Sequence, residues 1–159
     1  MSVSNKMVDR KTELIQIKKE EEQLKTTFWK YESQLNNIFN ESENIQQKLS
    51  EIENECQEKK NQTCLNFYDS YLIALNSINR KIHKSNNDAN KKCFETIPYS
   101  LRPQQEGKWD VKSQEGLTEL RKYVICSEPF YKEVIGFHYD DLSLKKEVDK
   151  KIRELVNNS

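Results

Sequence analysis

The sequence predicts an all-α protein in which long antiparallel helices form an elongated bundle stapled by disulfides. Three observations predict this class: an apolar heptad repeat in the first third, apolar residues three and four apart in most of the rest, and only three glycines and three prolines in 159 residues. Apolar residues make up 35% of the chain and charged residues 33%, which suits helices that each need one apolar stripe. We expect a single helical domain over residues 1–159.

The opening stretch, from Met7 to Cys56, carries the clearest signal. One seam position of its heptads is occupied by Met7, Leu14, Phe28, Leu35, Leu49 and Cys56, and the other by Ile17, Leu24, Tyr31, Ile38, Ile45 and Ile52. Glu21 and Ser42 interrupt the first position, and Arg10 interrupts the second. A repeat kept over about seven heptads indicates a long helix with a covered apolar stripe.

The segment Asn40-Glu41-Ser42-Glu43 makes it undecided whether the first helix continues to Cys56 or breaks near Asn40. An Asn followed three residues later by Glu is typical of a capping box, so a new helix could start there. The seam nevertheless continues in phase beyond it. An unbroken helix from Met7 to Cys56 would be about 75 Å long, and it would have to dimerise or be clasped by the rest of the chain. A broken one would fold into a hairpin.

A second long helix is expected after Cys56, so that residues 5–85 hold the long helices. Its apolar face consists of Cys64, Phe67, Tyr71, Leu75, Ile78 and Ile82. The polar run Ser85-Asn86-Asn87-Asp88 predicts a turn or a frayed end. Residues 94–116 contain two of the three prolines and two of the three glycines, which predicts an irregular connection. Trp109 lies in this connection, and we expect it to fold back over the core.

Residues 117–156 are predicted to form shorter helices that cover the long ones. Ser113 can cap the first of them. Ser127 with Pro129 two residues later predicts a new helix start, because proline suits the first turn. Gly136 is predicted to end that helix, and Asp140 or Asp141 to cap the last one.

The four cysteines, Cys56, Cys64, Cys93 and Cys126, match no zinc-binding spacing and have no neighbouring histidine. An even count fits two disulfides in an oxidising compartment, and it equally fits four buried free thiols in a cytosolic protein. Along an unbroken helix Cys56 and Cys64 would be about 12 Å apart, beyond the roughly 7 Å that a disulfide allows. Unless the helix breaks at Asn61-Gln62-Thr63, each therefore pairs with Cys93 or Cys126.

Other site residues are few. N-glycosylation sequons begin at Asn40, Asn61 and Asn157, and they favour secretion only slightly because the chain is rich in Asn. His83 and His138 stand apart and are interpreted as structural. No catalytic, metal-binding or cofactor-binding pattern is present, so the sequence predicts a non-enzymatic protein without a cofactor.

The charge balance and the hydropathy of the chain argue against binding to nucleic acid and against insertion into a membrane. The 26 basic and 26 acidic side chains balance, so no overall field favours nucleic acid. No apolar run approaches the roughly 20 residues that span a bilayer, and we expect no membrane insertion. Met1 leads into a polar segment, as in a cytoplasmic protein or in a secreted protein written without its leader and with an added Met.

Two cysteine-bearing segments carry a resemblance to a known group. LRKYVICSEPFYKEVIGF, from Leu120 to Phe137, and NECQEKKNQTCLNFYDSY, from Asn54 to Tyr71, resemble the helical domain of mosquito salivary proteins such as the aegyptin-like collagen binders and a salivary neutrophil-stimulating factor. The likeness covers roughly the last two thirds of the chain, and it consists of a similar Lys-, Asn- and Glu-rich helical composition and a similar placement of the cysteines.

This resemblance implies a secreted, non-enzymatic protein that binds a host protein or receptor and modulates immune or haemostatic responses. The chain lacks the acidic Gly-rich repeats of the aegyptin-like proteins, so immune modulation is expected rather than collagen binding. The alternative is an intracellular coiled-coil adaptor or tether that pairs with another chain through the seam from Met7 to Cys56. A monomer is favoured over a coiled-coil dimer.

Overall fold

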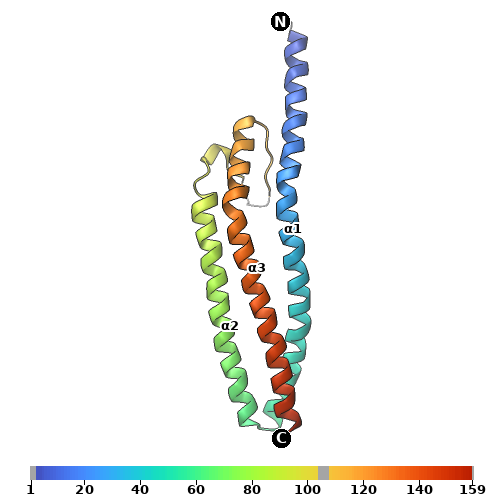
Figure 1. The fold of residues 1–159 in the computed structure, drawn as a ribbon, viewed down its shortest axis with the longest axis vertical. Coiled ribbons are helices and arrows are strands. Elements are labelled where there is room, and N and C mark those ends of the chain that lie inside the picture. The colour runs from blue at the N-terminus through green and yellow to red at the C-terminus, as the bar shows by residue number, and fades with distance from the viewer. Residues whose placement is uncertain (1–2, 104–107, 159) are drawn as a thin grey trace. The chain divides into compact units, whose positions relative to one another are not determined.

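All regular structure in the described part of the chain is helical, and no strand occurs there (Figure 1). The computed structural model describes the backbone of residues 3–103 and 108–158 and the side chains of residues 9–103 and 108–158. The elements are α1 (Val3–Glu58), α2 (Gln62–Ala89), the π-helix η1 (Asn90–Phe94), the 3-10 helix η2 (Tyr99–Leu101) and α3 (Gln114–Asn157). The predicted all-α class is confirmed.

The residues gather into two compact units, each with its own core. Unit 1 consists of Met1–Glu32 and Asn86–Lys132, and unit 2 consists of Ser33–Ser85 and Glu133–Ser159. Helices α1 and α3 contribute to both units, whereas nearly all of α2 belongs to unit 2. The two units are therefore described one at a time.

Helix α1 passes through Asn40 without a break, so the capping box at Asn40 does not form. From Leu14 to Cys56 every apolar seam residue is buried or half-buried, whereas Arg10 is exposed. The side chain of Met7 lies outside the described residues. Ile38 and Leu49, on either side of Asn40, are 3% and 0% exposed. Continuous burial on both sides favours continuing the helix over the local capping signal.

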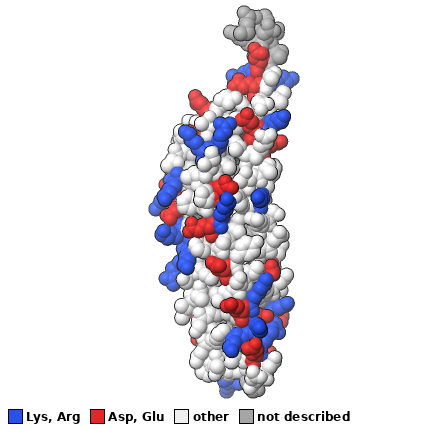
Figure 2. All heavy atoms as spheres, viewed as in Figure 1, with Lys and Arg blue, Asp and Glu red and all other residues white. Residues whose placement is uncertain are grey.

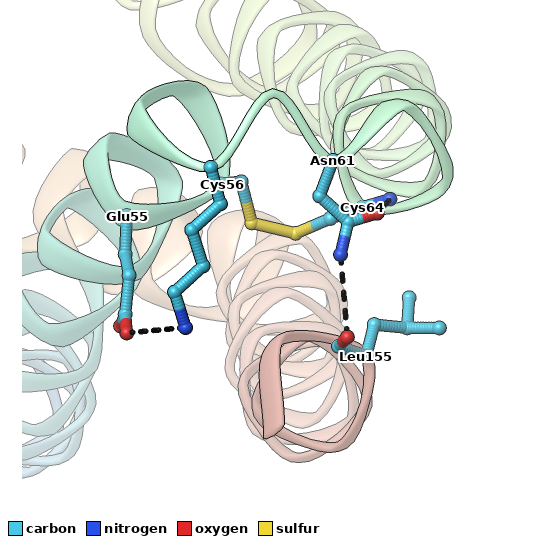
Figure 3. The surroundings of a disulfide bond; sticks show 6 residues. Glu55, Cys56, Asn61, Cys64 and Leu155 are labelled. Atoms are coloured by element: carbon cyan, nitrogen blue, oxygen red, sulfur yellow. Dashed lines mark hydrogen bonds and ion pairs between the residues drawn. A yellow bond between two sulfur atoms is a disulfide. The ribbon is translucent and has the colours of Figure 1, made fainter. Parts of the chain in front are cut away.

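A three-residue connection, from Lys59 to Asn61, joins α1 to α2 (Figure 3). Lys60 has a φ of 51°, the left-handed conformation that commonly ends a helix. The Asn61 N–H donates to the Cys56 carbonyl at 3.0 Å and the Lys60 N–H to the Gln57 carbonyl at 3.1 Å, which together make a Schellman motif. Asn61 then caps α2, because its Oδ1 accepts from the Cys64 N–H at 3.1 Å.

The core of unit 2 is shared by all three long helices. Helix α2 runs antiparallel to α1 after the turn, and the C-terminal half of α3 packs beside both (Figure 1). The buried residues are Leu49, Ile52 and Cys56 of α1, Cys64, Tyr68 and Tyr71 of α2, and Val148, Ile152 and Val156 of α3. Burial of this apolar surface is the main stabilising term of the unit.

The core of unit 1 is built from α1, α3 and the connection between α2 and α3. It contains Ile17, Cys93, Ile97, Trp109, Val111, Leu117, Leu120, Tyr123 and Val124. Trp109 is 5% exposed with its ring centroid 5.6 Å from that of Tyr123, so the prediction that it folds back over the core is confirmed. The predicted turn at Ser85–Asp88 is wrong: α2 continues to Ala89 and leads into η1.

The C-terminal third is one helix, α3, and not the predicted set of shorter helices over residues 117–156. Ser113 does cap it, since its Oγ accepts from the Gly116 N–H at 3.0 Å. Pro129 and Gly136 lie inside the helix without ending it. Proline in a helix interior costs about 3 kcal/mol, and buried residues of α3 on both sides of Pro129 offset that cost. They are Leu120, Tyr123 and Val124 before it and Val134, Ile135 and Leu142 after it.

Candidate functional site

The four cysteines form two disulfides, one in each unit. Cys56 pairs with Cys64 in unit 2, with the α-carbons 6.0 Å apart. Cys93 pairs with Cys126 in unit 1, with the α-carbons 5.6 Å apart. The helix breaks between Glu58 and Gln62, so Cys56 and Cys64 need no other partner. No cysteine is left free.

The two sequons within α1 and the turn have different surroundings. Asn40 is exposed on α1. Asn61 is half-buried, and its Nδ2 donates to the Leu155 carbonyl of α3 at 3.3 Å (Figure 3). Both polar atoms of the Asn61 side chain are therefore engaged in the fold of unit 2. Ser159 of the third sequon, which begins at Asn157, lies outside the described residues.

Replacing Asn61 with Ala is expected to lower the free energy of unfolding by about 1–2 kcal/mol. The variant loses the acceptor for the Cys64 N–H and the donor to Leu155. Urea unfolding of both proteins measures the difference. Asn40→Ala is the matched control, and an equal cost at both positions would show that the Asn61 contacts contribute nothing.

A pocket of about 430 Å³ lies in unit 2, where α1, α2 and α3 all contribute to its wall. Its lining residues are Phe39, Ser42, Glu43, Gln46, Gln47, Ser50, Leu75, Asn79, His138, Asp141 and Lys145. Its volume is in the range of small-ligand pockets, but such pockets are usually lined mainly by apolar side chains, and only Phe39 and Leu75 are apolar here. Its polar residues are therefore the first candidates for chemistry in this unit.

Ser42, Asp141 and Lys145 form a hydrogen-bonded cluster at this pocket. The Lys145 ammonium donates to Ser42 Oγ at 2.6 Å and to Asp141 Oδ2 at 3.0 Å. Ser42 Oγ in turn lies 3.4 Å from Asp141 Oδ2. Ser42 and Asp141 are 7% and 8% exposed, and Asp141 Oδ1 is buried without a hydrogen-bond partner. Ser42, which interrupts the predicted seam, is thus the α1 residue of a buried polar contact with Asp141 and Lys145 of α3.

The chemistry of this cluster is that of a structural ion pair. An ammonium has three donors and no acceptor, so Lys145 as paired here cannot take the proton of the Ser42 hydroxyl. A serine nucleophile needs an adjacent base. Asp141, predicted as a helix cap, instead lies within α3 and is a partner of Lys145.

His138 lies at the edge of the same pocket. Its ring meets that of Phe39 edge-on, with the centroids 4.8 Å apart. Burial lowers the pKa of His138, and Lys145 acts in the same direction while Asp141 opposes it. The imidazole is therefore neutral at neutral pH and packs as an aromatic ring. His83 is exposed on α2.

Unit 1 contains a second buried polar cluster around Glu21, the other interruption of the predicted seam. Glu21 is 4% exposed and forms ion pairs with Lys18 at 3.1 Å and Lys25 at 3.2 Å. Its Oε1 accepts from the Val111 N–H at 3.1 Å. Lys25 also donates to the Trp109 carbonyl at 2.6 Å. These contacts fix the connection between α2 and α3 onto α1.

The stability of unit 1 is expected to fall in acid because of Glu21. Burial raises the pKa of Glu21, but the Val111 N–H, Lys18 and Lys25 lower it, and the net pKa lies below the ordinary value of 4.5. The carboxylate therefore stabilises the fold above that value, and the contribution is lost as the pH falls through the folded-state pKa. Urea unfolding of the protein and of Glu21→Gln between about pH 7 and pH 3 should show a stability difference that shrinks in acid. A difference independent of pH would contradict this.

Two large aromatic side chains of unit 1 are exposed, and the sequence pattern singled out neither. Tyr99, on η2, is 87% exposed, with the Arg102 guanidinium 5.8 Å from its ring centroid. Trp29, on α1, is 55% exposed. Trp29 directly follows the seam residue Phe28, and a tryptophan at a non-seam position is the signal that could have identified it. Aromatic residues and arginine are the types that most often dominate binding surfaces.

The surface shows charges of both signs close together (Figure 2). Among the side chains that the structure describes, no group of three or more His, Cys, Asp or Glu is placed to hold a metal ion. None of the helices, over their described residues, is both long and apolar enough to cross a bilayer. In comparisons with known proteins, no family model, no curated protein and no solved structure matches this chain.

Proposed function

We propose that this chain is a secreted, non-enzymatic protein of the salivary type that binds a host protein or receptor and thereby modulates an immune or haemostatic response. The observation that supports it most is that all four cysteines are used in two disulfides within the chain. Such bonds persist in oxidising compartments and are rare in the cytosol. The salivary role itself rests on the resemblance of the two cysteine-bearing segments.

The exposed aromatic residues of unit 1 support binding to a protein. Tyr99 and Trp29 are 87% and 55% exposed to solvent. Side chains of this kind gain most from burial against a partner. The Cys93–Cys126 disulfide ties the region before Tyr99 to α3, so the ring is presented from a restrained segment. A preorganised contact loses less entropy on binding.

The burial of the seam weighs against the alternative of a coiled-coil tether. The seam residues from Leu14 to Cys56 pack inside the chain's own two units. Pairing with a second chain would have to displace α2 and α3 from α1. A tether would need an exposed stripe on α1, which the described side chains of this seam do not provide.

The proposal is tested with protein made through a secretory pathway, fluorescently labelled and added to vertebrate leukocytes and platelets. We expect saturable binding that unlabelled protein competes away. Tyr99→Ala or Trp29→Ala should weaken it by about tenfold or more, as expected for a residue central to an interface. Tyr139→Ala, in unit 2 and 49% exposed, is the matched control. Absence of saturable binding to both cell types would contradict the proposal.

A further inference from the structure

The two disulfides differ in their access to solvent. Cys56 and Cys64 are both 0% exposed. Cys93 is 3% exposed, whereas its partner Cys126 is only partly buried. A thiolate must reach a disulfide sulfur in line with the bond to attack it. Of the four half-cystines, Cys126 is the only residue that is not fully buried, so it is the one that we expect an external thiol to approach.

A pocket of about 410 Å³ lies beside the Cys93–Cys126 disulfide in unit 1. Both cysteines line it, together with Lys92, Lys122 and Glu119. Lys122 and Glu119 form an ion pair at 3.6 Å, in which Lys122 is exposed and Glu119 is half-buried. Two ammonium groups and one carboxylate leave the wall with a net positive charge, which favours an anion and stabilises a thiolate.

We propose that the Cys93–Cys126 disulfide is a thiol-exchange site for a small anionic thiol of the glutathione class. The incoming thiolate forms a bond to Cys126 Sγ, the Cys126–Cys93 bond breaks, and Cys93 leaves with the electron pair as a thiolate. The product is a mixed disulfide on Cys126 and a free Cys93. The Cys93 thiolate reverses the exchange when it attacks Cys126 Sγ and expels the bound thiol. A second thiol molecule instead completes the exchange, because it attacks the mixed disulfide, frees Cys126 as a thiolate and leaves as a small-molecule disulfide, so oxidising equivalents are conserved. This inference does not depend on the proposed host-binding function.

The exchange would loosen a defined part of unit 1. Cys93 lies in η1, and Cys126 lies in α3. The disulfide is the covalent link between them, and the two cysteines enclose the connection that carries Tyr99 and Trp109. Opening the bond removes the covalent restraint on this connection, which then keeps only its noncovalent contacts to α1 and to the core of unit 1.

The test uses the full native chain with glutathione as the probe, followed by acid quenching, alkylation and peptide mass spectrometry. We expect the glutathione adduct on Cys126, free Cys93, and a rate at least about tenfold above that of the Cys56–Cys64 bond. Equal rates for the two disulfides, or an adduct first on Cys93, Cys56 or Cys64, would overturn the proposal. Equal rates would mean that both bonds react only through unfolding.

The charge of the pocket is tested separately. Lys122→Glu should slow attack by glutathione and should speed attack by cysteamine, a cationic thiol, because the pocket wall becomes negative. Lys19→Glu, which makes the same charge change at an exposed position of α1, is the control. If both variants change the two rates alike, the pocket does not select an anionic thiol and that part of the proposal fails.

Discussion

Replacing Lys145 with Met is expected to lower the free energy of unfolding by about 3–5 kcal/mol. The Lys145 side chain is 12% exposed and supplies the only cation that pairs with Asp141 in unit 2 among the described contacts. Without it, Asp141 is left buried with Ser42 as a weak partner at 3.4 Å. An uncompensated buried carboxylate must either remain charged at great cost or bind a proton.

Two further variants distinguish the cost of the unpaired buried charge from the cost of changed side-chain packing. In Lys145→Met/Asp141→Leu both charges are gone, so most of the lost stability should return. Lys146→Met is the control, because Lys146 pairs with Glu41 at 2.8 Å with both side chains more than half exposed, and its loss should cost under about 1 kcal/mol. Urea unfolding measures all four proteins. A double variant less stable than Lys145→Met would show that the buried pair itself is strongly stabilising.

Removing the Cys93–Cys126 disulfide with alanine at both positions is expected to cost about 3–4 kcal/mol. Removing Cys56–Cys64 in the same way should cost about 2–3 kcal/mol. The first bond joins residues 33 apart and the second joins residues 8 apart. A longer loop constrains the unfolded chain more, so its loss releases more conformational entropy.

Thermal and urea unfolding of the two alanine pairs test this order. Ser50→Ala, an exposed change on α1, is the baseline. If the Cys56→Ala/Cys64→Ala protein is the less stable of the two, contacts at the α1–α2 turn outweigh loop entropy. The entropic argument would then be wrong for this fold.

The sequence predicted the helices well where periodicity and burial agree. The seam of α1 keeps its period from Leu14 to Cys56, so the heptad pattern was enough to place the apolar seam residues of this stretch on the covered face. Glu21 and Ser42 interrupt that pattern, and both are buried polar residues that hydrogen-bond to other parts of the chain. Their partners, Val111 and Lys145, are about 90 and 100 residues away, and no local pattern links them.

Features set by tertiary packing could not be predicted. Pro129 and Gly136 signal helix ends locally, yet α3 continues because apolar residues on both sides are buried. The pairing of Cys56 with Cys64 depended on whether a turn formed at Lys60, where no glycine marks it. The exposure of Tyr99 and the pocket beside Cys126 depend on how the connection folds, which composition does not specify.

The central claim is that the chain covers its own seam and locks that arrangement with two internal disulfides. A tryptic map under non-reducing conditions, on protein made through a secretory pathway, tests it most directly. We expect peptide 49–59 linked to peptide 61–80 and peptide 93–108 linked to peptide 123–132. Four free cysteines would contradict the account and favour the intracellular tether. Bonds between separate chains would contradict the claim that the disulfides lock the seam within one chain.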